Sequence, residues 1–87
     1  MNDLLALPNV GKVLAQNLLA AGITTPEQLY KEGSMNAFLK IRENADPDAC
    51  IRVLYGLQGA IEGIKDTNLS YLTKNELKHF FYTLNEK

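Results

Sequence analysis

The residues with the clearest chemical use form one turn near the N-terminus: Asn9, Val10, Gly11 and Lys12. The turn leads into an apolar helical pattern, so it places backbone N–H groups at a helix N-terminus, where anions such as phosphate bind. Asn9 tolerates positive φ, and Gly11 lets a phosphate approach the backbone. Lys12 adds one positive charge, while the apolar Val10 is expected to pack inward. The pattern predicts contact with a nucleic-acid backbone without sequence specificity.

The charge of the whole chain favours a second interpretation. Nine Lys and Arg stand against ten Asp and Glu, for a formal net charge of −1. The basic residues are scattered and form no run of the kind that follows a phosphate backbone. The alternative is therefore that the turn is only a structural corner, in a protein-interaction adaptor or a homodimerisation domain.

The elements that must position this turn are all predicted to be helices. Apolar residues recur at the helical period, capping residues separate the segments, and no stretch alternates with the period of a strand. A chain of 87 residues suffices for one domain, taken as residues 1–87, with a modest core. We expect about five helices: from Gly11 to Ala21, from Pro26 to Glu32 with a stop at Gly33, a third capped by Ser34, a fourth from Pro47 to Ile64 capped by Asp46, and a last one opened by the capping box Thr73–Glu76.

The predicted fourth helix carries an unusual row of small residues, Gly56, Gly59, Ala60 and Gly63. Each glycine inside a helix costs about 1 kcal/mol relative to alanine. A close approach by another helix of the same chain would account for this cost. The alternative is that these four residues form the seam of a homodimer, because two-fold contacts are the commonest kind in oligomers.

No constellation of residues predicts an enzyme, a cofactor or a metal site. Cys50 lies on the apolar stripe of the fourth helix and is interpreted as a small buried hydrophobe. His79 is expected to face solvent without a nucleophile at a recognisable spacing. Asp46 and Asp48 fit a helix start. With no secretory signal and no apolar run long enough to span a bilayer, we expect a cytoplasmic protein with no membrane contact.

Several blocks of sequence, in order, carry a resemblance to a known family. They are Leu7–Ala15, Ala21–Ile23, Ala37–Arg42, Cys50–Ile64 and Leu77–Phe81, of which the fourth is the most diagnostic. In these blocks the chain resembles the C-terminal domain of the TfoX (Sxy) family of bacterial competence regulators. The resemblance implies an all-α fold of two crossed helical hairpins, similar to SAM-like and helix-hairpin-helix domains. It also implies a role in regulating DNA transformation, with DNA or a regulatory protein as the partner.

Overall fold

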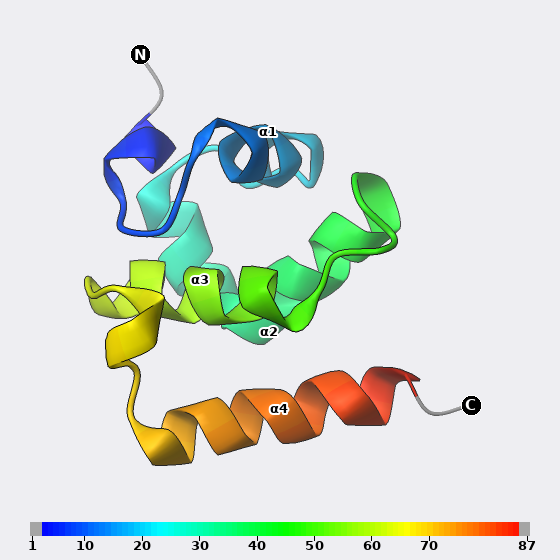
Figure 1. The fold of residues 1–87 in the computed structure, drawn as a ribbon. Helices are drawn as coiled ribbons and strands as arrows, with labels where there is room; N and C mark the ends of the chain where they lie inside the picture. Colours follow the sequence, from blue (N-terminus) through cyan, green and yellow to red (C-terminus); the bar gives the residue numbers. More distant parts are fainter. Residues whose placement is uncertain (1–2, 86–87) are drawn as a thin grey trace.

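The computed structural model describes residues 3–85, so both ends of the predicted domain, residues 1–2 and 86–87, lie outside the described part. Within residues 3–85 the chain forms helices joined by turns and loops and contains no strand, which confirms the all-α class. Its elements are the 3₁₀ turn η1 (Asp3–Ala6), α1 (Lys12–Ala20), α2 (Pro26–Asn44), α3 (Ile51–Glu62), the 3₁₀ turn η2 (Asp66–Asn68) and α4 (Tyr71–Asn85) (Figure 1).

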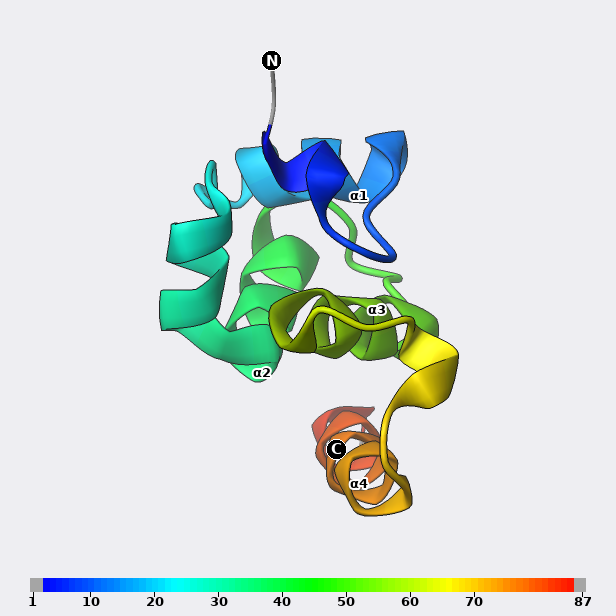
Figure 2. The same ribbon diagram turned by 90° about the vertical axis from the view of Figure 1, so that its left-hand side faces the viewer.

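The helix α3 lies in the middle of the molecule. It packs most extensively against α2, with α1 on one side and α4 on the other (Figures 1 and 2). The short turn η2 reverses the chain after α3, so α4 runs back antiparallel to α3 (Figure 1). The start of α1 and the outer face of α4 therefore lie on opposite sides of the molecule.

One apolar core joins all four helices. Phe38 of α2, Leu18 of α1 and Leu54 of α3 are fully buried, and Leu77 of α4 is nearly so. The last helix adds Phe81, whose ring centroid lies 5.9 Å from that of Phe38. Burial of these side chains supplies the main favourable term in folding, at about 25 cal/mol per Å² of apolar surface.

Gly33 divides α2 into two helical segments that meet at a kink, as the sequence predicts. Its backbone angles, φ 82° and ψ 162°, are not helical, although helix continues on both sides. The predicted second and third helices are thus two halves of α2, and the count falls from about five to four. Ser34, predicted as a cap at this point, is buried, and its hydroxyl donates to Oε1 of Gln58 in α3 at 2.6 Å.

Two predicted helix starts are wrong. The helix α3 begins at Ile51 rather than Pro47, with Cys50 at its N-cap. Asp46 does not cap it, because its Oδ1 accepts the N–H of Asp48 at 3.0 Å and closes a local turn ahead of the helix.

The other misplaced start belongs to α4. This helix begins at Tyr71, two residues before the predicted Thr73. Ser70 Oγ accepts the N–H of Thr73 at 3.1 Å, so Ser70 takes the capping role and Thr73 lies inside the first turn. By contrast, the predicted cap of α2 is confirmed, since Thr25 Oγ1 accepts the N–H of Gln28 at 3.1 Å.

Candidate nucleic-acid interface

The backbone of the turn before α1 has the geometry that its sequence predicts. Asn9 has φ 67°, and it is the only non-glycine residue with positive φ in the described chain. The N–H of Val10 donates to the carbonyl of Leu7 at 3.3 Å, which closes the turn. Gly11 is then extended, at φ −93°, and serves as the N-cap of α1.

The side chain of Asn9 points into the protein and not toward a ligand. Its Nδ2 donates to the carbonyl of Ile64 at 2.9 Å and, more weakly, to that of Gly56 at 3.4 Å. Its Oδ1 accepts the N–H of Asp66 at 3.1 Å. These partners lie 47 to 57 residues away in the sequence. Asn9 therefore ties the turn before α1 to α3 and to the segment between α3 and η2.

The same contacts explain two of the glycines in α3. A Cβ on Gly59 would overlap Nδ2 of Asn9 and lie 2.7 Å from the Ile64 carbonyl oxygen. A Cβ on Gly56 would lie 3.5 Å from Cβ of Asn9. The expected close approach is real, but the approaching group is a side chain on a turn and not another helix.

Three of the four residues of the predicted dimer seam lie inside the molecule. Gly56, Gly59 and Ala60 are buried by other parts of the same chain, so a second copy has no access to them. Gly63 is exposed and ends α3 in the left-handed conformation at φ 78°, where glycine is favoured for the backbone alone.

Of the four residues predicted to contact nucleic acid, two face solvent. Gly11 and Lys12 are exposed, Val10 is 7% exposed and packs in the core, and Asn9 is held as described above. No side chain caps the first turn of α1. The groups that remain to meet an anion are the backbone N–H donors of that turn and the ammonium group of Lys12.

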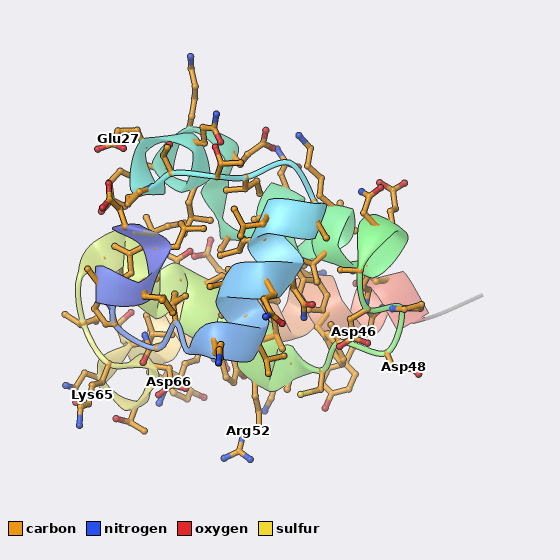
Figure 3. The ribbon with its side chains drawn as sticks, turned by 90° about the horizontal axis from the view of Figure 1, so that it is seen from above. Glu27, Asp46, Asp48, Arg52, Lys65 and Asp66 are labelled. Atoms are coloured by element: carbon orange, nitrogen blue, oxygen red, sulfur yellow. The ribbon has the colours of Figure 1, made fainter. Side chains whose placement is uncertain are left out.

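The fold brings two further cations to the edge where α1 begins. Arg52 of α3 and Lys65, just after α3, project along this edge together with Asp66 (Figure 3). No ion pair within residues 3–85 engages Lys12, Arg52 or Lys65. Sequence reasoning did not select Arg52 or Lys65, because they lie far from Lys12 in the chain. Only the tertiary structure places them on either side of the contact between Asn9 and α3.

A groove separates α1 from α3 at this edge. Its lining comes from both helices and from the loops beside them: Asn9, Val13, Leu14, Asn17, Asp46, Arg52, Val53, Gly56 and Asp66. The charges around it are mixed, since Asp46 and Asp66 accompany Arg52. The apolar part of the lining includes Val13, which is 71% exposed.

The remaining candidates for chemistry have structural or solvent-facing positions. Cys50 is exposed at the N-cap of α3, so its predicted burial is wrong; the later start of the helix takes it off the apolar stripe. His79 is exposed, as expected. Residues 3–85 hold no group of three or more His, Cys, Asp or Glu that could ligate a metal. None of the helices in that range is long and apolar enough to cross a bilayer.

Comparison with known proteins places the chain in a family. The profile described as TfoX C-terminal domain matches residues 1–81. The chain therefore belongs to the TfoX C-terminal domain family. No curated protein matches it.

Two similar crystal structures come from Listeria monocytogenes, and both are of proteins without an assigned function. A triclinic form of an uncharacterised protein is 48% identical, with a TM-score of 0.91, over 94% of this chain and 92% of that one. A tetragonal form of a protein of unknown function is also 48% identical, with a TM-score of 0.89, over 93% of this chain and 99% of that one. These structures share the fold in detail.

Proposed function

We propose that this TfoX C-terminal domain is a non-catalytic regulatory module of bacterial competence, acting in the cytoplasm, and that it contacts a nucleic-acid backbone where α1 begins. The observation that carries the proposal is the arrangement of this edge. Asn9 fixes the turn from inside, so the uncapped first turn of α1 faces solvent beside Lys12, Arg52 and Lys65.

Such an edge suits phosphate better than bases. A phosphate oxygen would accept from the first-turn N–H groups of α1, with Lys12 as a mobile point charge and Arg52 as a fork of donors. Contacts of this kind position a protein on the duplex without reading its sequence. Three cations with Asp66 beside them predict weak, strongly salt-dependent binding, with a log–log slope of roughly −2 to −3.

A fluorescence-anisotropy titration with duplex DNA at low salt tests the proposal. We expect Lys12→Glu and Arg52→Glu each to weaken binding severalfold. Lys31→Glu makes the same change of net charge on an exposed site in the first half of α2, and it should have a smaller effect. Absence of binding at low salt, or equal loss in all three variants, would contradict the contact.

The adaptor is the second candidate, and the groove between α1 and α3 favours it. Val13 is largely exposed and Leu14 half-buried there, and apolar side chains in a groove suit a protein ligand better than a phosphate chain. Val13→Asp separates the two functions. It should abolish capture of a protein partner in the absence of DNA. If the edge instead binds phosphate, the affinity for DNA should fall only by the effect of one added negative charge.

A further inference from the structure

The outer face of α4 exposes a large apolar side chain that the fold does not use. The helix packs on the core through Leu77 and Phe81, while Leu72 is 76% exposed. On the turns that follow Leu72 along one side of the helix lie Glu76, His79 and Thr83. At 100° per residue these four positions fall within about 60° of the helix circumference.

The surface beside this stripe is hollowed at two places. One hollow lies at the start of α4 and is lined by Leu72, Asn75, Glu76 and His79. The other is lined by Met35, Glu76, His79, Phe80, Thr83 and Leu84. Glu76 and His79 line both hollows, so they form the ridge between them. The second hollow is the more apolar, because Met35 of α2 and Phe80 and Leu84 of α4 contribute to it.

The spacing of the stripe is symmetric. The intervals between its residues are four, three and four, so the spacing is the same whether it is counted from Leu72 or from Thr83. A second α4 laid antiparallel against the first brings Leu72 opposite Thr83 of the other copy and Glu76 opposite His79 of the other copy. A two-fold axis between the helices makes each of these pairings twice.

We propose that two copies of this chain associate through α4 in this antiparallel arrangement. Each Leu72 enters the apolar hollow of the other copy, beside Met35, Phe80 and Leu84. Each Glu76 carboxylate accepts a hydrogen bond from a ring N–H of the opposite His79. The Glu76 carboxylate is a hydrogen-bond acceptor and the His79 ring N–H a donor, so these two groups are complementary across the axis, and Leu72 matches the apolar hollow. Together these matches identify the occupant as a second copy.

This surface is independent of the proposed contact with nucleic acid. The outer face of α4 lies across α3 from the start of α1 (Figures 1 and 2). A dimer built on α4 leaves both α1 edges open. Two linked edges would bind a long duplex more tightly than one, through effective concentration alone.

Sedimentation equilibrium over micromolar to millimolar concentrations tests the dimer. We expect the mass to rise toward twice that of the 9.7 kDa chain. Leu72→Asp should raise the dissociation constant by about tenfold or more, because it would bury an unpaired carboxylate. Tyr71→Asp is the matched control: it is equally exposed, at 76%, and adjacent in the same helix, but faces away from the stripe.

A charge exchange tests the pairing itself. Glu76→Lys should weaken association, and adding His79→Glu should restore it, because the double variant places opposite charges across the axis. All four residues changed in these tests are exposed, and circular dichroism checks that each variant keeps the fold. A monomer at every concentration overturns the proposal. A dimer whose dissociation constant is unchanged by Leu72→Asp also overturns it, as does an equally large increase in Tyr71→Asp. The same holds if the double variant dimerises no more tightly than Glu76→Lys.

Discussion

The two sides of α3 share one apolar core, but different contacts fix the turn on one side and the helix on the other. On one side, the turn before α1 is fixed by polar bonds from Asn9 to backbone groups of distant segments. On the other side, α4 is anchored by apolar burial, with Leu77 and Phe81 in the core. Directional bonds define the position of one short turn, whereas apolar packing attaches a whole helix and leaves its outer face available. The comparison predicts that the two sides fail differently when they are perturbed.

The largest loss of stability is expected from a substitution on the apolar side, in α4. Phe81→Ala removes a buried ring that packs against Phe38 and lies 5.1 Å from the guanidinium carbon of Arg42. We expect a loss of about 3–5 kcal/mol in the free energy of unfolding, measured with urea. Tyr82→Ala, at the neighbouring and 54% exposed position, should cost far less. Equal losses would mean that Phe81 is no anchor.

A substitution on the polar side, at Asn9, should lower the free energy of unfolding somewhat less. Asn9→Ala removes the bonds to Ile64 and Asp66 and places a less suitable residue at positive φ. We expect a loss of about 3 kcal/mol, from roughly 1 kcal/mol per hydrogen bond plus the backbone term. Asn9→Gly separates the two contributions, because it keeps the backbone term favourable and loses only the bonds. A loss below that of the exposed Asn36→Ala would contradict the role of Asn9.

The fit between Asn9 and α3 predicts a smaller change. Gly59→Ala places a methyl group against Nδ2 of Asn9 and the Ile64 carbonyl, and should destabilise the protein by about 1–3 kcal/mol. The control is Gly11→Ala, where a Cβ meets nothing within 4 Å and φ is negative. Thermal unfolding measures both variants. If Gly59→Ala were neutral, the glycine would not be required by the approach of Asn9.

The smallest expected effect concerns charge and not stability. Asp66→Asn removes the acid beside Arg52 and Lys65, while its backbone N–H still donates to Asn9. If the edge binds phosphate, affinity for duplex DNA at low salt should rise by about twofold to fivefold, a change below 1 kcal/mol. Asp48→Asn, an exposed change of the same charge in the loop before α3, serves as the control in the same titration.

The sequence predicted the backbone better than the contacts. Gly33 and Thr25 were identified from local rules, because a positive φ and a helix cap depend on neighbouring residues. The prediction that Asp46 caps a helix failed because Asp is favoured both in local turns and at helix caps, and local rules do not distinguish the two. The wrong start then placed Cys50 in the core, although it is exposed.

For the site, the sequence indicated the tight turn at Asn9 and the need for small residues in α3. It did not connect the two. Asn9 and Gly59 lie on opposite sides of a contact that closes only in the tertiary fold, and no periodicity in one chain reports such a pair. The positions of Arg52 and Lys65 could not be predicted for the same reason. The row of glycines suggested a partner helix because helix packing is the commonest cause of small residues.

The bond from Asn9 to Ile64 also has a consequence for the order of folding. It joins residues 55 positions apart, so its formation must close a loop spanning most of the chain. Until α3 and the segment after it have docked, the turn before α1 has no fixed position. The start of α1 should therefore acquire its final geometry among the last events of folding. An unfolded or partly folded chain would then lack the exposed edge that is proposed above to bind phosphate.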